Sequence, residues 1–167
     1  MRRCDTVLPG LASVTPGPPF MTTVLAAIDF SPVGRGVLAA ATGLARAIGG
    51  RVVLLHVVQP PPIATDLAPL VGDVLQFTAD LERGAKRQLQ RIQKRLAARG
   101  VTIETTCGQG SPVSRILAHA KALEARYVVL GSHGHSAFHD LVAGGTTSGV
   151  LKRATCPVVV VPAAPKK

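Results

Sequence analysis

Short, nearly continuous apolar runs alternate along this chain with longer segments of helical periodicity. Runs that carry apolar side chains at almost every position are typical of strands covered on both faces. Such runs span residues 23–28, 51–58, 127–130 and 157–162. Another run, residues 101–106, alternates polar and apolar side chains, so we expect it to lie at the edge of a sheet. The pattern therefore predicts five strands.

Amphipathic helices are predicted between these strands. Ser31 as N-cap and Pro32 as first helical residue indicate a helix start, and Ser111 and Pro112 repeat this pattern. Three apolar stripes follow helical spacing, and a short last helix is expected at about residues 146–153. The stripes are Val37, Ala41, Leu44 and Ile48; Leu81, Ala85, Leu89, Ile92 and Leu96, within a helix over residues 73–99; and Val113, Ile116, Leu117, Ala120 and Leu123.

Strands that alternate with helices indicate an α/β fold with a five-stranded parallel doubly wound sheet. The strand order we expect is 3-2-1-4-5. Ligands of open sheets of this kind bind beyond the carboxyl ends of the strands, where the winding direction reverses. In this order the reversal lies between the first and fourth strands. Asp29 and Gly131 are therefore expected to face the same crevice.

The composition indicates one domain with a tail at each end. The 167 residues are 47% apolar and only 17% charged, which excludes a fully disordered chain. Residues 1–20 are interrupted by proline and glycine and are expected to form a disordered N-terminal tail, followed by a domain over residues 21–162 and a C-terminal tail over residues 163–167. The Pro-rich residues 59–72 are expected to form a surface loop. No run reaches the roughly 18 to 20 apolar residues of a membrane span.

The net charge of +10 raises the question of an anionic partner. Much of the excess lies on the long helix predicted over residues 73–99. The motifs of RNA-binding sheets, zinc fingers and helix-turn-helix proteins are missing, so a solvated basic face is favoured over contact with an anionic polymer, and nucleic acid is an unlikely partner. The basic residues are Arg83, Lys86, Arg87, Arg91, Lys94, Arg95 and Arg99.

Cysteine usage points to a reducing compartment. The three cysteines, Cys4, Cys107 and Cys156, include no closely spaced pair, so neither a disulfide framework nor a CxxC metal site is predicted. The cytoplasm is the expected location. Cys107 and Cys156 are expected to be buried as small apolar residues.

A glycine-rich segment, residues 131–148, follows the fourth predicted strand and precedes the last predicted helix. Glycine lets the backbone approach an anion closely, and a helix start offers unpaired N–H groups, so this segment predicts a phosphate-binding loop. The Walker pattern GxxxxGK[ST] is missing. The lysine and magnesium-binding hydroxyl of a P-loop enzyme are therefore not predicted.

Together these features resemble the universal stress protein family over nearly all of residues 21–162. The resemblance rests on residues 27–31 (AIDFS), on residues 54–57 (LLHV), on the glycines Gly131, Gly134 and Gly144, and on the final run 156–161 (CPVVVV). It implies a Rossmann-like fold with an adenine-nucleotide site, and it implies ATP as ligand, with a divalent ion such as Mg or Mn at the phosphates.

Transferred to this sequence, the resemblance implies that Ala27, Ile28 and Asp29 lie near the adenine and ribose, and that the backbone of Val57 meets the adenine edge. The ribose and phosphates would be held by Gly131, His133, Gly134, His135, Gly144, Gly145, Thr146 and Thr147. In the ATP-binding branch, serine or threonine follows the glycine that corresponds to Gly144. Here Gly145 stands at that position, which implies that a hydroxyl contact is lost or is shifted to Thr146 or Thr147.

Several of these residues have other interpretations. Asp29 is also suited to cap the turn after its strand, and His56 is favoured as a hydrogen-bonded core histidine. His133, His135 and His139 stand where family members often carry Arg or Lys. Because histidine gains charge in mild acid, we hypothesise that ATP binds more tightly there. A zinc site formed by these histidines is the weaker alternative.

The predicted function is that of a nucleotide-binding regulatory protein of the stress response, not an enzyme, although slow ATP hydrolysis stays open. The alternative is a dimeric interaction module that keeps the fold and binds no nucleotide. A nucleotidyl-transferring enzyme would need a catalytic or metal motif that the sequence lacks. In each case the apolar run Val158–Val161 is expected to pair two copies at a sheet edge.

Overall fold

The computed structural model describes residues 21–59, 71–132 and 145–163, with side chains omitted for residues 71–75. The predicted N-terminal tail, most of the Pro-rich loop and the histidine-containing part of the glycine-rich segment lie outside these residues. Five strands form one parallel sheet in the order β3-β2-β1-β4-β5, so the predicted fold class and strand order are confirmed. The strands are β1 (Thr23–Ala27), β2 (Arg51–Val58), β3 (Ile103–Gln109), β4 (Tyr127–Ser132) and β5 (Val158–Pro162).

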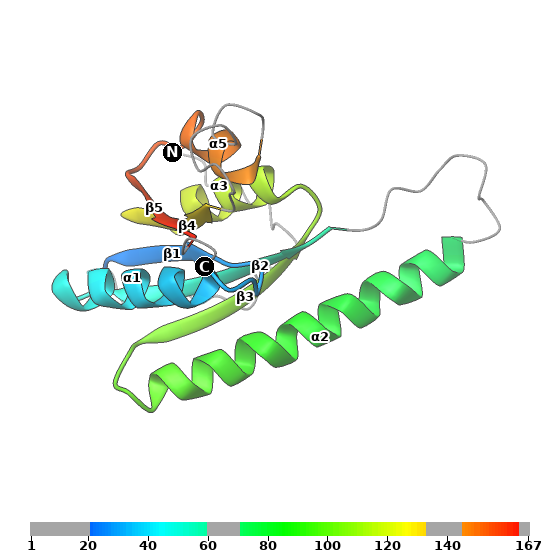
Figure 1. Ribbon diagram of the computed structural model, residues 1–167, viewed down its shortest axis with the longest axis horizontal. Coiled ribbons are helices and arrows are strands. Elements are labelled where there is room, and N and C mark those ends of the chain that lie inside the picture. Colours follow the sequence, from blue (N-terminus) through cyan, green and yellow to red (C-terminus); the bar gives the residue numbers. More distant parts are fainter. Residues whose placement is uncertain (1–20, 60–70, 133–144, 164–167) are drawn as a thin grey trace, which may run out of the picture.

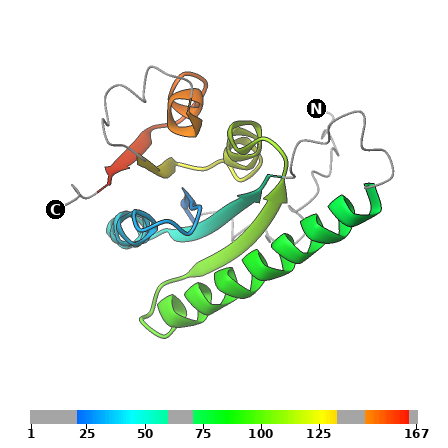
Figure 2. The same ribbon diagram turned by 45° about the vertical axis from the view of Figure 1, so that its right-hand side comes forward.

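Helices cover both faces of this sheet (Figures 1 and 2). The described helices are α1 (Gly34–Ala47), α2 (Val71–Ala97), α3 (Pro112–Ala122) and α5 (Thr146–Leu151). Successive strand residues point to opposite faces: Val24 and Ala26 belong to the apolar cluster beneath α1 and α2, whereas Leu25 belongs to the cluster beneath α3. This two-sided burial explains why the central strands are continuous apolar runs rather than alternating ones.

The start of α1 differs from the prediction. The helix begins at Gly34, with Val33 as N-cap, and Ser31 and Pro32 belong to the preceding turn. In this turn the Gly34 N–H donates to the Ser31 carbonyl at 2.9 Å. The second Ser-Pro pair behaves as predicted, because Ser111 is the N-cap of α3 and proline is its first residue, although the serine hydroxyl makes no capping hydrogen bond.

The apolar stripe of α2 is confirmed only in its second half. Ala85, Leu89 and Leu96 are buried and Ile92 packs against them, but Leu81 is 41% exposed. Thr78, three residues before Leu81, is buried, so the buried face of α2 passes beside Leu81 and not through it. The amino-terminal end of α2 extends past the sheet (Figures 1 and 2). All seven basic side chains of this segment are exposed, in agreement with the predicted basic face.

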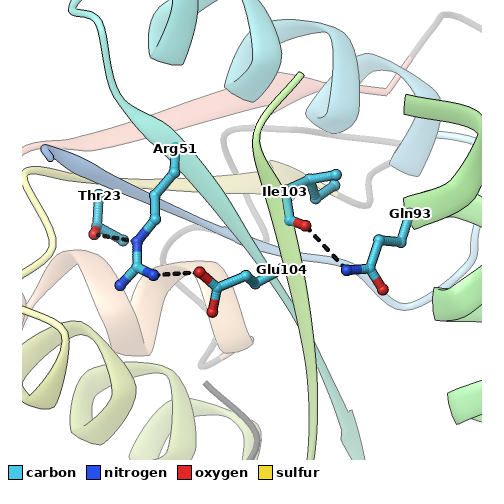
Figure 3. Close-up of polar contacts among 5 residues, drawn as sticks. All are labelled: Thr23, Arg51, Gln93, Ile103 and Glu104. Atoms are coloured by element: carbon cyan, nitrogen blue, oxygen red, sulfur yellow. Dashed lines mark hydrogen bonds and ion pairs between the residues drawn. The ribbon is translucent and has the colours of Figure 1, made fainter. Parts of the chain in front are cut away.

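A buried polar network ties together the amino ends of the strands (Figure 3). Arg51 is 3% exposed, forms an ion pair with Glu104 and donates from Nε to Thr23 Oγ1 at 3.2 Å. These contacts link β1, β2 and β3 at the end of the sheet opposite the predicted crevice. Nearby, the side-chain amide of Gln93 donates to the Ile103 carbonyl at 3.0 Å and fixes α2 on β3.

The described cysteines are not paired in a disulfide. Cys107 on β3 is buried, as expected, and desolvation is the main cause that raises the pKa of its thiol to about 11. At neutral pH this thiol therefore stays protonated and inert. Cys156 is only half-buried, so the expectation of burial was wrong for it.

Candidate functional site

The turn that follows β1 carries an unusual backbone conformation. Phe30 has φ = 63°, a left-handed conformation that is strained for a non-glycine residue. Two contacts hold it there: Asp29 Oδ1 accepts a hydrogen bond from the Ser31 N–H at 3.0 Å, and the Phe30 ring packs 4.3 Å from the His56 ring, centre to centre. The turn at the carboxyl end of β1 is therefore contacted by Asp29 from within and by His56 from β2.

His56 completes this arrangement. Its Nδ1 donates to the Ile28 carbonyl at 2.8 Å, so the histidine is a half-buried residue with a satisfied hydrogen bond, as predicted. The capping role considered for Asp29 is also observed, in its hydrogen bond to Ser31. An ionised carboxylate can accept about four hydrogen bonds. The Asp29 carboxylate is exposed and can therefore accept hydrogen bonds from a ligand in addition to the one from Ser31.

Gly131, near the end of β4, is closely approached by α1. A Cβ atom at this position would lie 2.6 Å from Val33 Cγ1 and 3.4 Å from Val37 Cγ2. The first distance is far below van der Waals contact, so helix packing alone requires a glycine here. The sequence analysis explained this glycine by the close approach of an anion and did not anticipate its contact with α1.

The start of α5 lies beside the end of β4. Thr147 Oγ1 donates to the Gly131 carbonyl at 3.0 Å, so the hydrogen of this hydroxyl is already engaged and the oxygen can accept a further hydrogen bond. Gly145 is the N-cap of α5 in an extended conformation, with φ = −67° and ψ = 170°. The hydroxyl available to donate to a ligand is therefore that of Thr146, which is exposed.

A cavity of about 260 Å³ lies at the carboxyl ends of β1, β2 and β4, where the strand order reverses. Several of the residues implicated by the sequence line it: Ala27, Ile28, Asp29, Val57, Gly131, Gly145, Thr146 and Thr147. The cavity thus brings together residues from three distant parts of the chain. The remaining implicated residues, His133, Gly134, His135 and Gly144, and also His139, lie outside the described residues.

Other lining residues were not anticipated. Val33, Gly34 and Val37 come from the start of α1, Pro112 and Ile116 come from α3, and Leu55, Gln59, Leu130 and Ser132 complete the wall. The helix starts had a usable signal: a helix that follows a parallel strand begins at the carboxyl edge of the sheet, and so borders the crevice. Gln59 had none.

The lining is mainly apolar, with a few polar groups at its edge. Among the described lining residues, Asp29 is the only one with an ionisable side chain, and no cationic side chain faces the cavity. Such a site can enclose a flat, partly apolar group and accept hydrogen bonds from hydroxyls. Within the described parts of the chain, no group of three or more His, Cys, Asp or Glu residues could hold a metal ion.

Comparison with known proteins agrees with this architecture. Residues 21–162 match the model of the universal stress protein family. The chain is 30% identical to the universal stress protein YxiE of Bacillus subtilis over 143 residues, which cover 83% of this chain and 97% of the relative. A universal stress protein of Thermus aquaticus is 31% identical, with coverage of 83% and 97%.

Solved structures give the same result. The universal stress protein UspA from Lactobacillus plantarum superposes with a TM-score of 0.72 at 25% identity, over 84% of this chain and 97% of that one. None of the helices in the described ranges is long and apolar enough to cross a membrane. From the matched family model, the relatives of similar length and the shared fold, we conclude that this chain belongs to the universal stress protein family.

Proposed function

We propose that this protein binds ATP in the cavity at the carboxyl ends of β1, β2 and β4, and that it acts in the cytoplasm as a regulatory protein of the stress response. The observation that carries the proposal is the convergence of Asp29, Val57 and the Gly145–Thr147 segment on one cavity at the switch point of the sheet. Their positions in the sequence are far apart, and a single small molecule would contact all three.

Two solved relatives support an adenine nucleotide as the ligand. A universal stress protein solved in complex with cAMP has a TM-score of 0.57 and 23% identity to this chain. The universal stress protein from Archaeoglobus fulgidus in complex with dAMP has a TM-score of 0.52 and 20% identity. These ligands are those of the relatives, and the cavity described above offers a similar ligand a place in this chain.

The chemistry of the cavity fits the adenosine part of the nucleotide. Its volume of about 260 Å³ is near the lower end of small-molecule sites, which span about 300–1,000 Å³, so the base and ribose would fill it. Val57 lies beyond the last residue of β2 paired with β1, Leu55, so the β1-facing edge of β2 is available to the base there. Asp29 would accept hydrogen bonds from the ribose hydroxyls, as an acidic residue does in dinucleotide-binding folds.

The phosphates would then lie at the mouth of the cavity beside the exposed Gly145 and Thr146. Because no cationic side chain from the described residues lines the cavity, backbone N–H groups and a divalent ion are expected to balance much of the phosphate charge. Magnesium bound to a nucleotide keeps several waters and phosphate oxygens as ligands, so it would need no carboxylate beyond Asp29, which is assigned to the ribose.

We propose binding rather than catalysis. In the described lining, no histidine, cysteine or lysine accompanies Asp29 as a general base or nucleophile. Occupancy by ATP, rather than its turnover, is then the regulatory signal.

We also propose that two copies pair through β5. This strand is at the edge of the sheet, and Val158–Val161 are only half-buried in the single chain. An exposed apolar edge strand is a ready partner for a second copy. Size-exclusion chromatography with light scattering should give the mass of a dimer, and a monomer at all concentrations would contradict this proposal.

The nucleotide proposal is tested by releasing small molecules from the purified, denatured protein for mass spectrometry, followed by calorimetric titration of the emptied protein with ATP. Recovered ATP and saturable binding at one site per chain are expected. No recovered nucleotide together with no titratable binding would refute the proposal and favour the alternative, an interaction module of the same family that needs no nucleotide.

A further inference from the structure

We propose a second ligand site, separate from the nucleotide cavity, that binds a small organic anion with an apolar body. It is a pocket of about 300 Å³ between the start of α1 and the second half of α2. Arginine side chains form part of its wall, and an apolar surface forms the rest. The lining residues are Ile28, Phe30, Ser31, Gly34, Arg35, Leu38, Gln88, Arg91, Ile92 and Arg95.

Helical spacing explains how α2 contributes one side of this pocket. Gln88, Arg91, Ile92 and Arg95 are separated by three, one and three residues, so they lie on one face of the helix. The opposite side comes from Gly34, Arg35 and Leu38 in the first turns of α1. The strained turn after β1 completes the pocket with Ile28, Phe30 and Ser31.

All the charged side chains in the described lining of the pocket are cationic. Arg35, Arg91 and Arg95 make no ion pair within the described residues, and no carboxylate belongs to the described lining. The acidic groups of α2 that form ion pairs do so elsewhere, Asp80 with Arg83 and Glu82 with Lys86. The first turn of α1 also lacks an acidic residue. A bound anion could accept charge-assisted hydrogen bonds from these guanidinium groups.

The apolar part of the lining specifies the rest of the ligand. Phe30, Leu38 and Ile92 offer ring and branched aliphatic surface beside the guanidinium groups. The pocket volume of about 300 Å³ is at the lower end of the roughly 300–1,000 Å³ typical of small-molecule sites. A carboxylate or phosphate head group on a short aliphatic or aromatic body matches both parts.

This pocket differs in chemistry from the nucleotide cavity. No described lining residue of the nucleotide cavity is cationic, whereas three arginines line this pocket. Ile28 and Gly34 contribute to both, so the two sites are neighbours on either side of the turn after β1. The proposal does not depend on nucleotide binding.

Methyl-labelled NMR of the full chain tests the proposal, with octanoate, octyl phosphate and the neutral octan-1-ol as probes. We expect saturable shifts of the Leu38 and Ile92 methyl signals with the two anions. The tighter-binding anion identifies the head group. Octan-1-ol should bind much more weakly because it lacks the charge. Signals of Ile116, which lines only the nucleotide cavity, should stay unchanged.

Two double variants, each of which removes two positive charges, serve as the test and its matched control. Arg91→Gln with Arg95→Gln should weaken anion binding about tenfold or more, because two charge-assisted contacts are removed. Arg87→Gln with Lys94→Gln changes exposed cations of the same helix outside the pocket and should leave the affinity nearly unchanged. The proposal is overturned if neither anion gives saturable shifts below its micelle-forming concentration, if octan-1-ol binds as tightly, or if both double variants weaken binding equally.

Discussion

The contact between Gly131 and α1 gives the sharpest test of the packing around the site. In Gly131→Ala, the new Cβ would lie 2.6 Å from Val33 Cγ1 and 3.2 Å from Val33 Cγ2. Both atoms belong to a branched side chain at the N-cap of α1, which cannot rotate both away at once. The helix start must therefore move away from β4, or Val33 must take a poor rotamer.

The expected cost follows from the geometry. Overpacking a close-packed contact by one methyl group typically costs about 1–3 kcal/mol, and we expect Gly131→Ala to lower the free energy of unfolding by that amount. Val33→Ala removes both colliding atoms. The double variant should then be more stable than the sum of the two single effects predicts, by about 1 kcal/mol or more.

Urea denaturation of the wild type, both single variants and the double variant measures this coupling. Gly131 is not in a left-handed conformation, so alanine there adds no backbone strain to confuse the result. Effects that add within about 0.5 kcal/mol would refute the steric explanation.

The ATP affinities of the same four proteins distinguish an effect on packing from an effect on ligand binding. If Gly131 serves mainly the contact with α1, the double variant should recover ATP affinity along with stability. Because Val33 also lines the cavity, the comparison is with Val33→Ala alone: a stable double variant that binds ATP more weakly than Val33→Ala would show that the ligand itself needs the space at Gly131.

Three further predictions concern charge and pH. Asp29→Asn keeps an oxygen to accept from the Ser31 N–H but loses the charge, so ATP affinity in calorimetry should fall about five- to thirtyfold, equivalent to about 1–2 kcal/mol, with little change in melting temperature. His119 is fully buried, and desolvation lowers its pKa below the ordinary value of about 6.5. The unfolded chain therefore binds the proton more readily, so the free energy of unfolding should fall as the pH drops below about 6.5, and His119→Leu should flatten this dependence in urea titrations. ATP affinity should rise from pH 8 to pH 6 if His133, His135 and His139 charge beside the phosphates, and unchanged or weaker binding at pH 6 would contradict this.

The arrangement of the sheet could be predicted because it depends on a pattern that the sequence carries directly. Central strands such as β1 and β2 are apolar on both faces, and helical crossovers make them parallel. The exposure of Leu81 was missed for a related reason. The spacing of Leu81 and Ala85 fits one apolar stripe, but spacing does not show where the edge of the buried face of α2 lies, and Thr78 and Ala85 are the buried residues on either side of Leu81.

The turn after β1 could not be predicted in detail. Phenylalanine disfavours a left-handed backbone, and nothing local in the sequence suggests one at Phe30. The Phe30 ring packs on His56, which is distant in the chain. The helix was expected to begin at Pro32 with Ser31 as N-cap, whereas the structure has Val33 as N-cap and Gly34 as the first residue.

The candidate sites, too, could be predicted only in part. The sequence indicated which strand ends would meet, and Asp29, Val57 and Gly131 do line one cavity. It did not indicate that the Thr147 hydroxyl donates a hydrogen bond to the Gly131 carbonyl, or that Arg35 would lie across a pocket from Arg91. Both depend on how two helices dock, and docking is decided by contacts between segments that are far apart in the chain.

The most direct measurement of the central claim is an NMR titration of the methyl-labelled protein with ATP and magnesium. Binding in the proposed cavity predicts saturable shifts of the Val57, Ile116 and Leu130 methyl signals, all of which line it. Leu38 and Ile92 line only the second pocket and should shift little. No saturable shift, or shifts confined to Leu38 and Ile92, would contradict the claim that this cavity is the nucleotide site.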